Sequence, residues 1–169
     1  FNILNTTKWN IGGLFLEEST RKTARSIMSL HANKLLHLPD TPTTEQELKD
    51  AFDATLGSNR IYLFDHFGSS DVDNISNRIR YMAKACDCRV IFLDHITMLA
   101  TGTADGDERR LLDYLSTKLA QMVEELNFCL FLISHENDDG KTKLVNARKA
   151  FMAASQRVEK LRLLRECLG

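Results

Sequence analysis

Two continuous apolar runs in the second half of the chain constrain its fold more than any other feature. The first covers residues 90–93 and stops at Asp94, and the second covers residues 128–133 and stops at Ser134. A strand that is apolar at every position is buried on both faces, as in a parallel sheet covered by helices, whereas a strand with one wet face alternates apolar and polar residues. The chain therefore favours an α/β fold with a mostly parallel sheet.

Other segments alternate with these runs in the way that such a fold requires. Strands are also predicted at residues 12–16 and 60–64, and helices at residues 20–36, 44–56, 71–84 and 108–126. Thr44 followed by Glu47 is a capping-box signal for the start of a helix. The helix over residues 108–126 carries its apolar residues on one face: Leu111, Leu112, Leu115, Leu119, Met122 and Val123. We expect helices on both faces of the sheet.

Length and composition point to one globular domain. The chain has 169 residues, of which 43% are hydrophobic and 27% are charged. These are ordinary values for a globular protein with a real core. No apolar run approaches the roughly 18 residues that a membrane helix needs. The net charge of −1 does not indicate a nucleic-acid binder, although a protein that holds DNA on a few loops need not be basic overall.

The four cysteines are best interpreted as reduced thiols of a cytosolic protein. Cys86 and Cys88 form a lone C-x-C, and no second close pair or Cys/His cluster completes a zinc site. Cys129 lies inside an apolar run and is predicted to be a small buried hydrophobe. Cys167 stands alone near the end of the chain.

Three polar residues close three of the apolar strands, namely Glu17, Asp94 and His135. In parallel sheets ligands bind at the carboxyl ends of the strands, so these side chains are expected at one edge. Asp94 has the position from which nucleotide motors present a carboxylate to Mg²⁺, and Glu17 that of a base for the attacking water. Each also has a simpler interpretation: a helix cap for Asp94, a carboxylate at a helix start for Glu17, and a locally satisfied imidazole for His135.

The residues and order of these motifs resemble those of phage primase–helicases, which are related to DnaB-like and Twinkle-like hexameric replicative helicases. The similarity covers roughly residues 8–143. The stretch from Gly13 to Ser19 followed by Leu30-His31, the stretch 90–96, and Leu132-Ile133-Ser134-His135 all resemble family motifs. So do Asp107-Glu108-Arg109-Arg110, Asp113 and Thr117-Lys118-Leu119.

This resemblance implies a RecA-type motor that forms a ring, expected to be a hexamer, and moves on single-stranded DNA. It implies ATP or another nucleoside triphosphate as substrate and Mg²⁺ as cofactor. By the same resemblance Glu17 matches the catalytic base, Asp94 the Mg²⁺ carboxylate and His135 the γ-phosphate sensor. Lys141 and Lys143 match a loop that grips the DNA backbone, although a solvated basic turn is the simpler interpretation. A phage-encoded protein of this kind would work in the host cytoplasm, with no membrane partner.

Two departures from the family pattern limit the prediction. No complete G-x-x-x-x-G-K-[ST] phosphate loop is present, and Gly140-Lys141-Thr142 is a chance match because position 135 is histidine. In the family that loop precedes the point where this chain begins, so residues 1–9 are expected to be the remains of the helix that follows it. We also expect residues 1–143 to form a partial motor domain and residues 144–169 a basic helical tail, which leaves the fold incomplete at both ends.

Two functional classes therefore remain open. The chain is either a piece of an enzyme motor or a non-catalytic ring-assembly or DNA-binding module with a degenerate RecA-like fold. Retention of Glu17, Asp94 and His135 favours the first, while the missing phosphate loop favours the second for the chain by itself, which is expected to be inactive. A recombinase-type relative is disfavoured by the residues around Glu17 and Asp94.

Overall fold

The computed structural model of the chain describes residues 1–65, 71–100 and 105–133. Helices and strands alternate along the chain, as predicted. Their order is α1 (Asn2–Thr6), β1 (Asn10–Phe15), α2 (Thr20–Ala32), α3 (Glu45–Ala54), η1 (Leu56–Ser58), β2 (Ile61–Phe64), α4 (Val72–Lys84), β3 (Cys88–Asp94), η2 (Ile96–Ala100), α5 (Asp105–Leu126) and β4 (Cys129–Ile133), where η1 and η2 are short 3-10 helices.

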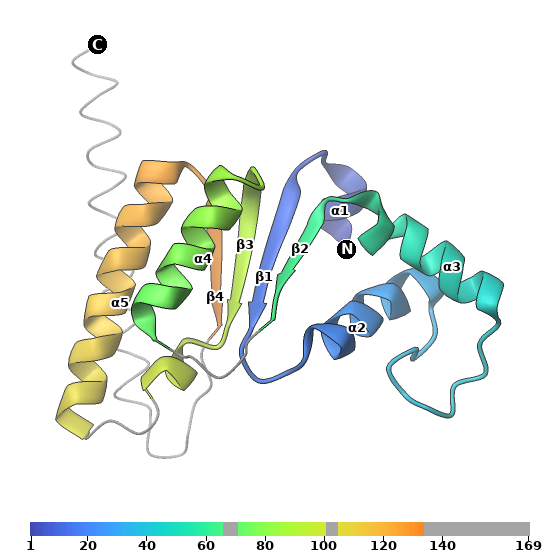
Figure 1. Cartoon of the computed structure of the whole chain (residues 1–169), viewed down its shortest axis with the longest axis horizontal. Coiled ribbons are helices and arrows are strands. Elements are labelled where there is room, and N and C mark those ends of the chain that lie inside the picture. The colour runs from blue at the N-terminus through green and yellow to red at the C-terminus, as the bar shows by residue number, and fades with distance from the viewer. Residues whose placement is uncertain (66–70, 101–104, 134–169) are drawn as a thin grey trace, which may run out of the picture.

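The strands form one sheet in the order β2-β1-β3-β4, and every pair is parallel. All four strands therefore end at the same edge, which is the lower edge of the sheet in Figure 1. The prediction of an α/β fold with a parallel sheet is confirmed. Strand β1, first in the chain, becomes a central strand because β2 and β3 pair with its two sides.

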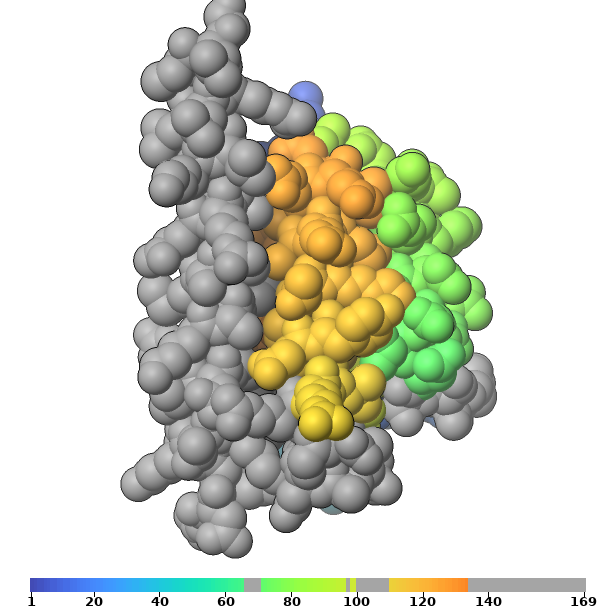
Figure 2. Space-filling view, turned by 90° about the vertical axis from the view of Figure 1, so that its left-hand side faces the viewer, coloured from blue at the N-terminus to red at the C-terminus, as the bar shows by residue number. Residues whose placement is uncertain are grey.

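Helices α4 and α5 cover one face of the sheet and form the main core with it. Figure 2 shows the two helices side by side on this side of the molecule. Most of the largest fully buried side chains of this core lie on the covered strands and on these helices: Leu14, Ile75, Ile79, Ile91, Leu93, Leu115, Leu119 and Met122. The predicted apolar face of α5 thus packs where expected. A Cβ atom on Gly12 would lie 2.7 Å from the Met82 sulfur, so glycine lets α4 approach β1 closely.

The opposite face of the sheet is covered unevenly. Residues of α1 and α2 lie over β1 and β2 and leave a groove of about 300 Å³, lined by apolar side chains that include Phe15 and Phe92. Towards β4, Phe131 stacks on Phe92 with ring centroids 4.9 Å apart and remains 46% exposed. The prediction that Cys129 is buried is wrong, because Cys129 lies on this thinly covered face of β4, which pairs with β3 alone among the described strands.

Element ends differ from the predictions in ways that have local causes. Helix α2 stops at Ala32 rather than near residue 36, because Asn33 takes a left-handed conformation with φ of 50° and caps the helix. Helix α3 has the predicted capping box between Thr44 and Glu47. The α2–α3 hairpin has a small core of its own around Met28, Leu36 and Ala51, and it extends away from the sheet (Figure 1).

Candidate functional site

The site is built on the carboxyl ends of β1 and β3. Phe15 pairs with Asp94 at the last register position of these strands. The pairing continues one residue further, because the Leu16 N–H donates to the Asp94 carbonyl at 2.6 Å. Glu17 follows directly in the bend after β1. The structure therefore brings Glu17 and Asp94, which are far apart in the sequence, to neighbouring strand ends.

Asp94 carries a buried carboxylate oxygen that lacks a partner among the described residues. Its Oδ1 atom is buried and makes no hydrogen bond in the part of the chain that the structure describes. A buried unpaired oxygen reduces stability, so such an atom needs an explanation. Binding of a cation or of a polar ligand would supply it.

The Asp94 carboxylate fits the way in which nucleotide enzymes bind Mg²⁺, with few ligands from the protein. Among residues 1–65, 71–100 and 105–133, no group of three or more His, Cys, Asp or Glu side chains could hold a metal ion. These residues are thus not expected to bind a metal ion through protein side chains alone. Mg²⁺ in nucleotide enzymes is instead held by one or two carboxylates together with phosphates and water. One rigid carboxylate at a strand end, such as Asp94, matches that requirement.

Glu17 is paired with a residue that the sequence did not single out. The Nε2 atom of His95 lies 2.7 Å from Oε1 of Glu17. The His95 side chain is only 8% exposed, whereas that of Glu17 is 56% exposed. A buried imidazole from the end of β3 thus meets an accessible carboxylate from the end of β1. The one signal in the sequence was a polar residue placed between Asp94 and the apolar Ile96.

Glu18, the neighbour of Glu17, has a different environment. Its carboxylate accepts a hydrogen bond from the Thr23 hydroxyl at 2.7 Å and pairs with Lys22 at 3.1 Å. Both partners lie in the first turn of α2, where a negative charge also interacts favourably with the helix dipole. Ser19 caps the same helix by accepting from the Lys22 N–H. Glu18 therefore stabilises the start of α2.

The remaining predicted site residues lie outside the described part of the chain. These are His135, Lys141 and Lys143. The last residue of β4, Ile133, pairs beside Asp94 on the strand next to β3. The roles assigned to the three residues stay predictions.

No helix among the described residues has the length and apolar character needed to cross a bilayer.

Comparison with known proteins agrees with this architecture. The chain is 28% identical over 137 residues to a DNA helicase/primase of Enterobacteria phage T3, covering 79% of this chain and 24% of that protein. A KaiC-like protein of Pyrococcus horikoshii has a similar structure, with a TM-score of 0.50 and 20% identity over 73% of this chain and 46% of that one. No protein-family model matches. The chain thus spans about a quarter of its curated relative. The resemblance to a phage helicase/primase is confirmed, and the fold is RecA-like.

Proposed function

We propose that this chain is part of the motor of a replicative DNA helicase, which hydrolyses a nucleoside triphosphate to move along single-stranded DNA. One observation carries the proposal: Glu17 and Asp94 lie at adjacent strand ends, and Asp94 has a buried oxygen without a described partner. A rigid carboxylate for Mg²⁺ beside an accessible carboxylate for water is the arrangement that phosphoryl transfer to water requires.

Each residue has a separate task in this mechanism. Asp94 would hold Mg²⁺, which neutralises charge on the β- and γ-phosphates when it is bound. Glu17 would orient the attacking water and accept its proton, while His135 would contact the γ-phosphate. The exposure of Glu17 leaves its carboxylate accessible to substrate from solvent. Glu18 is engaged with α2, which supports Glu17 as the base.

Catalysis also requires a phosphate cradle from outside residues 1–169, because these residues contain no complete phosphate-binding loop. In a ring the site would lie between subunits, and we propose self-association into a hexamer. The isolated chain should then show negligible turnover. Turnover of the purified chain that Asp94→Ala abolishes would contradict this expectation and would make Gly140-Lys141-Thr142 a working loop.

The proposed track is single-stranded DNA, bound in the host cytoplasm if a phage encodes the protein. Lys141 and Lys143 would bind DNA phosphates, which position a strand without reading its sequence. Removing one of these phosphate interactions by alanine substitution should lower the salt dependence of log affinity by roughly 0.7 for a single strand. Unchanged slopes in both variants would favour the solvated-turn interpretation of these lysines.

A chimaera tests the proposal directly. Residues 8–143 would replace the corresponding segment of the phage T3 DNA helicase/primase, and hydrolysis stimulated by single-stranded DNA would be measured. We expect turnover that Asp94→Asn abolishes, with the unmodified T3 protein as positive control and the isolated chain as negative control. A chimaera that folds and binds nucleotide without hydrolysing it would contradict the motor proposal.

The second candidate, a non-catalytic ring-assembly or DNA-binding module, is favoured by the missing phosphate loop alone. It predicts that the isolated chain associates with the T3 protein or binds DNA weakly without any chemistry at Asp94. Mixing the isolated chain with the T3 protein and measuring the mass of the assembly and its turnover separates the two candidates. Incorporation of the chain together with an inactive chimaera would support the module.

A further inference from the structure

A buried histidine stands next to the candidate magnesium ligand. His95 directly follows β3, and it is one of few polar residues that are buried in the described part of the chain. Burial of an imidazole reduces stability unless its polar atoms have partners. The carboxylate of Glu17 lies against this ring, at 2.7 Å from Nε2 to Oε1. The sequence motifs assign no task to this residue.

We propose that His95 is a positioning residue, which holds the Glu17 carboxylate in the orientation needed for a base. The inference rests on the proposed function, because it assigns His95 a task in that site. A base must lie within hydrogen-bond reach of the proton that it accepts, and a third group often orients it. Here the third group is the imidazole of His95, which directly follows the strand that carries Asp94 and has its Nε2 atom 2.7 Å from Oε1 of Glu17.

His95 is well suited to this task because its own position is fixed. It lies between β3 and η2, and the Met98 N–H donates to the His95 carbonyl at 3.2 Å. Ile96 and Leu99 of η2 are buried in the main core, which anchors the turn that carries the ring. A ring that is already rigid loses little conformational freedom when it binds a carboxylate.

Glu17 needs such an anchor more than its neighbours do. It lies in the bend after β1, outside regular structure, on a long side chain that is 56% exposed. Glu18 is held by Thr23 and Lys22, both on α2. Lys22 pairs with Glu18 rather than with Glu17. The pairing with His95 therefore ties Glu17 to the end of β3, and the base moves together with the metal-binding strand.

The position can be probed in the chain itself with two substitutions. His95→Gln places an amide N–H near the place of Nε2, and His95→Leu keeps an apolar side chain of similar size without a donor. The measurement is the NMR order parameter of the Glu17 side-chain methylene groups, with those of Glu18 as internal control. We expect a loss of order at Glu17 in His95→Leu and recovery in His95→Gln, with no change at Glu18. Equal order at Glu17 in wild type and His95→Leu would overturn the proposal.

Turnover in the T3 chimaera gives an independent measurement. Positioning predicts that His95→Leu lowers kcat by about 10- to 100-fold with the KM for nucleotide within about twofold, and that His95→Gln restores most of the rate. If His95 contributes only core packing, His95→Leu should keep a higher kcat than His95→Gln, since leucine suits an apolar site better than glutamine. That result would also overturn the proposal. A wild-type chimaera that folds and binds nucleotide without turnover contradicts the motor function, while the order parameters still decide the positioning role.

Discussion

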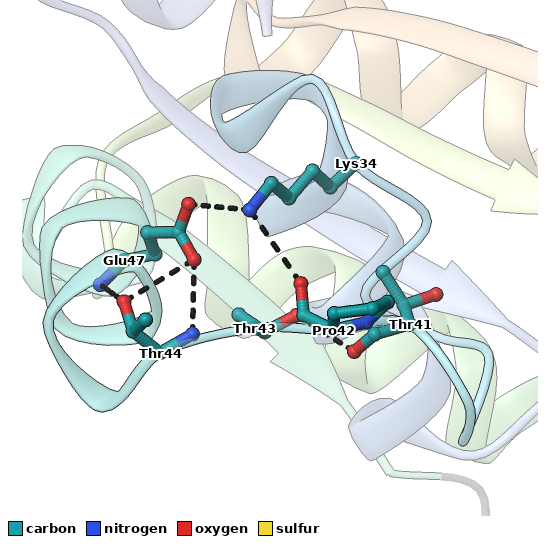
Figure 3. Close-up of polar contacts among 6 residues, drawn as sticks. All are labelled: Lys34, Thr41, Pro42, Thr43, Thr44 and Glu47. Carbon is teal, nitrogen blue, oxygen red and sulfur yellow. Dashed lines mark hydrogen bonds and ion pairs between the residues drawn. The ribbon is translucent and has the colours of Figure 1, made fainter.

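The carboxyl edge of the sheet and the α2–α3 hairpin both contain carboxylates in polar clusters, yet the clusters are built differently. In the hairpin, Glu47 accepts hydrogen bonds from the Thr44 N–H at 2.9 Å and from the Thr44 hydroxyl at 3.2 Å, and it pairs with Lys34 (Figure 3). Lys34 also approaches the Pro42 carbonyl at 3.5 Å. The cluster joins the end of α2 to the start of α3, and each of its charges has a partner within the hairpin.

At the sheet edge the two carboxylates have different surroundings. Asp94 has a buried oxygen without a described partner, and His95, which pairs with Glu17, comes from a different strand. A polar cluster whose groups all have hydrogen-bond partners stabilises the fold. A buried polar group without a partner reduces stability, and such groups are retained at sites where they are required for function. The contrast is consistent with a structural role for Glu47 and with the functional roles proposed for Glu17 and Asp94.

The largest expected effect concerns the two adjacent glutamates after β1. In the T3 chimaera, Glu17→Gln should lower kcat by about 100- to 10,000-fold with nucleotide binding retained, because an amide cannot accept the proton of water. Glu18→Gln should change kcat by less than about threefold, since Glu18 serves the start of α2. Steady-state turnover and nucleotide titration measure both. Reversed effects would place the base one residue later.

Asp94→Asn should stabilise the isolated chain by about 1 kcal/mol, because it removes the negative charge from a half-buried carboxylate that has one buried oxygen without a described partner. Urea unfolding followed by circular dichroism measures the change. The same substitution should abolish turnover in the chimaera, so stability and activity would move in opposite directions. If Asp94→Asn destabilises the chain instead, the Asp94 carboxylate is satisfied and the contrast with the hairpin fails.

Thr44→Ala should destabilise the chain by about 1 kcal/mol, because it removes the threonine hydroxyl from the capping box at the start of α3. Lys49→Ala, at an exposed position of the same helix, is the matched control and should be close to neutral. Chemical denaturation of both variants measures the difference. Equal stabilities would show that the cap contributes nothing to the hairpin.

The smallest effect is a change in the pH dependence of stability. The hydrogen bond from Lys34, followed by that from the Thr44 N–H, lowers the pKa of Glu47 from 4.5 to about 2. A lowered pKa stabilises the folded state above 4.5, and this contribution disappears as the pH falls towards 2. Lys34→Met should therefore lower the Tm slightly at pH 6, and the difference should vanish near pH 2. A difference that persists at pH 2 would assign the effect of Lys34 to packing.

Features that depend on neighbouring residues in the chain were predictable. The capping box of α3, the apolar face of α5 and the ends of β2 and β3 follow from local pattern, and they agree with the structure to within a few residues. The end of α2 was missed because a left-handed Asn33 is only one of several ways to stop a helix. The exposure of Cys129 was missed because apolar neighbours in the sequence do not reveal whether a face of a strand is covered.

The sequence by itself determined that Glu17 and Asp94 would meet at one edge, since apolar runs specify parallel strands and parallel strands end together. Only the tertiary structure decided that β1 lies directly beside β3, that Asp94 keeps a buried oxygen without a described partner, and that His95 lies against Glu17. The reason is physical: strand period and helix caps act over a few residues, whereas burial and hydrogen-bond partners depend on which strands become neighbours in space.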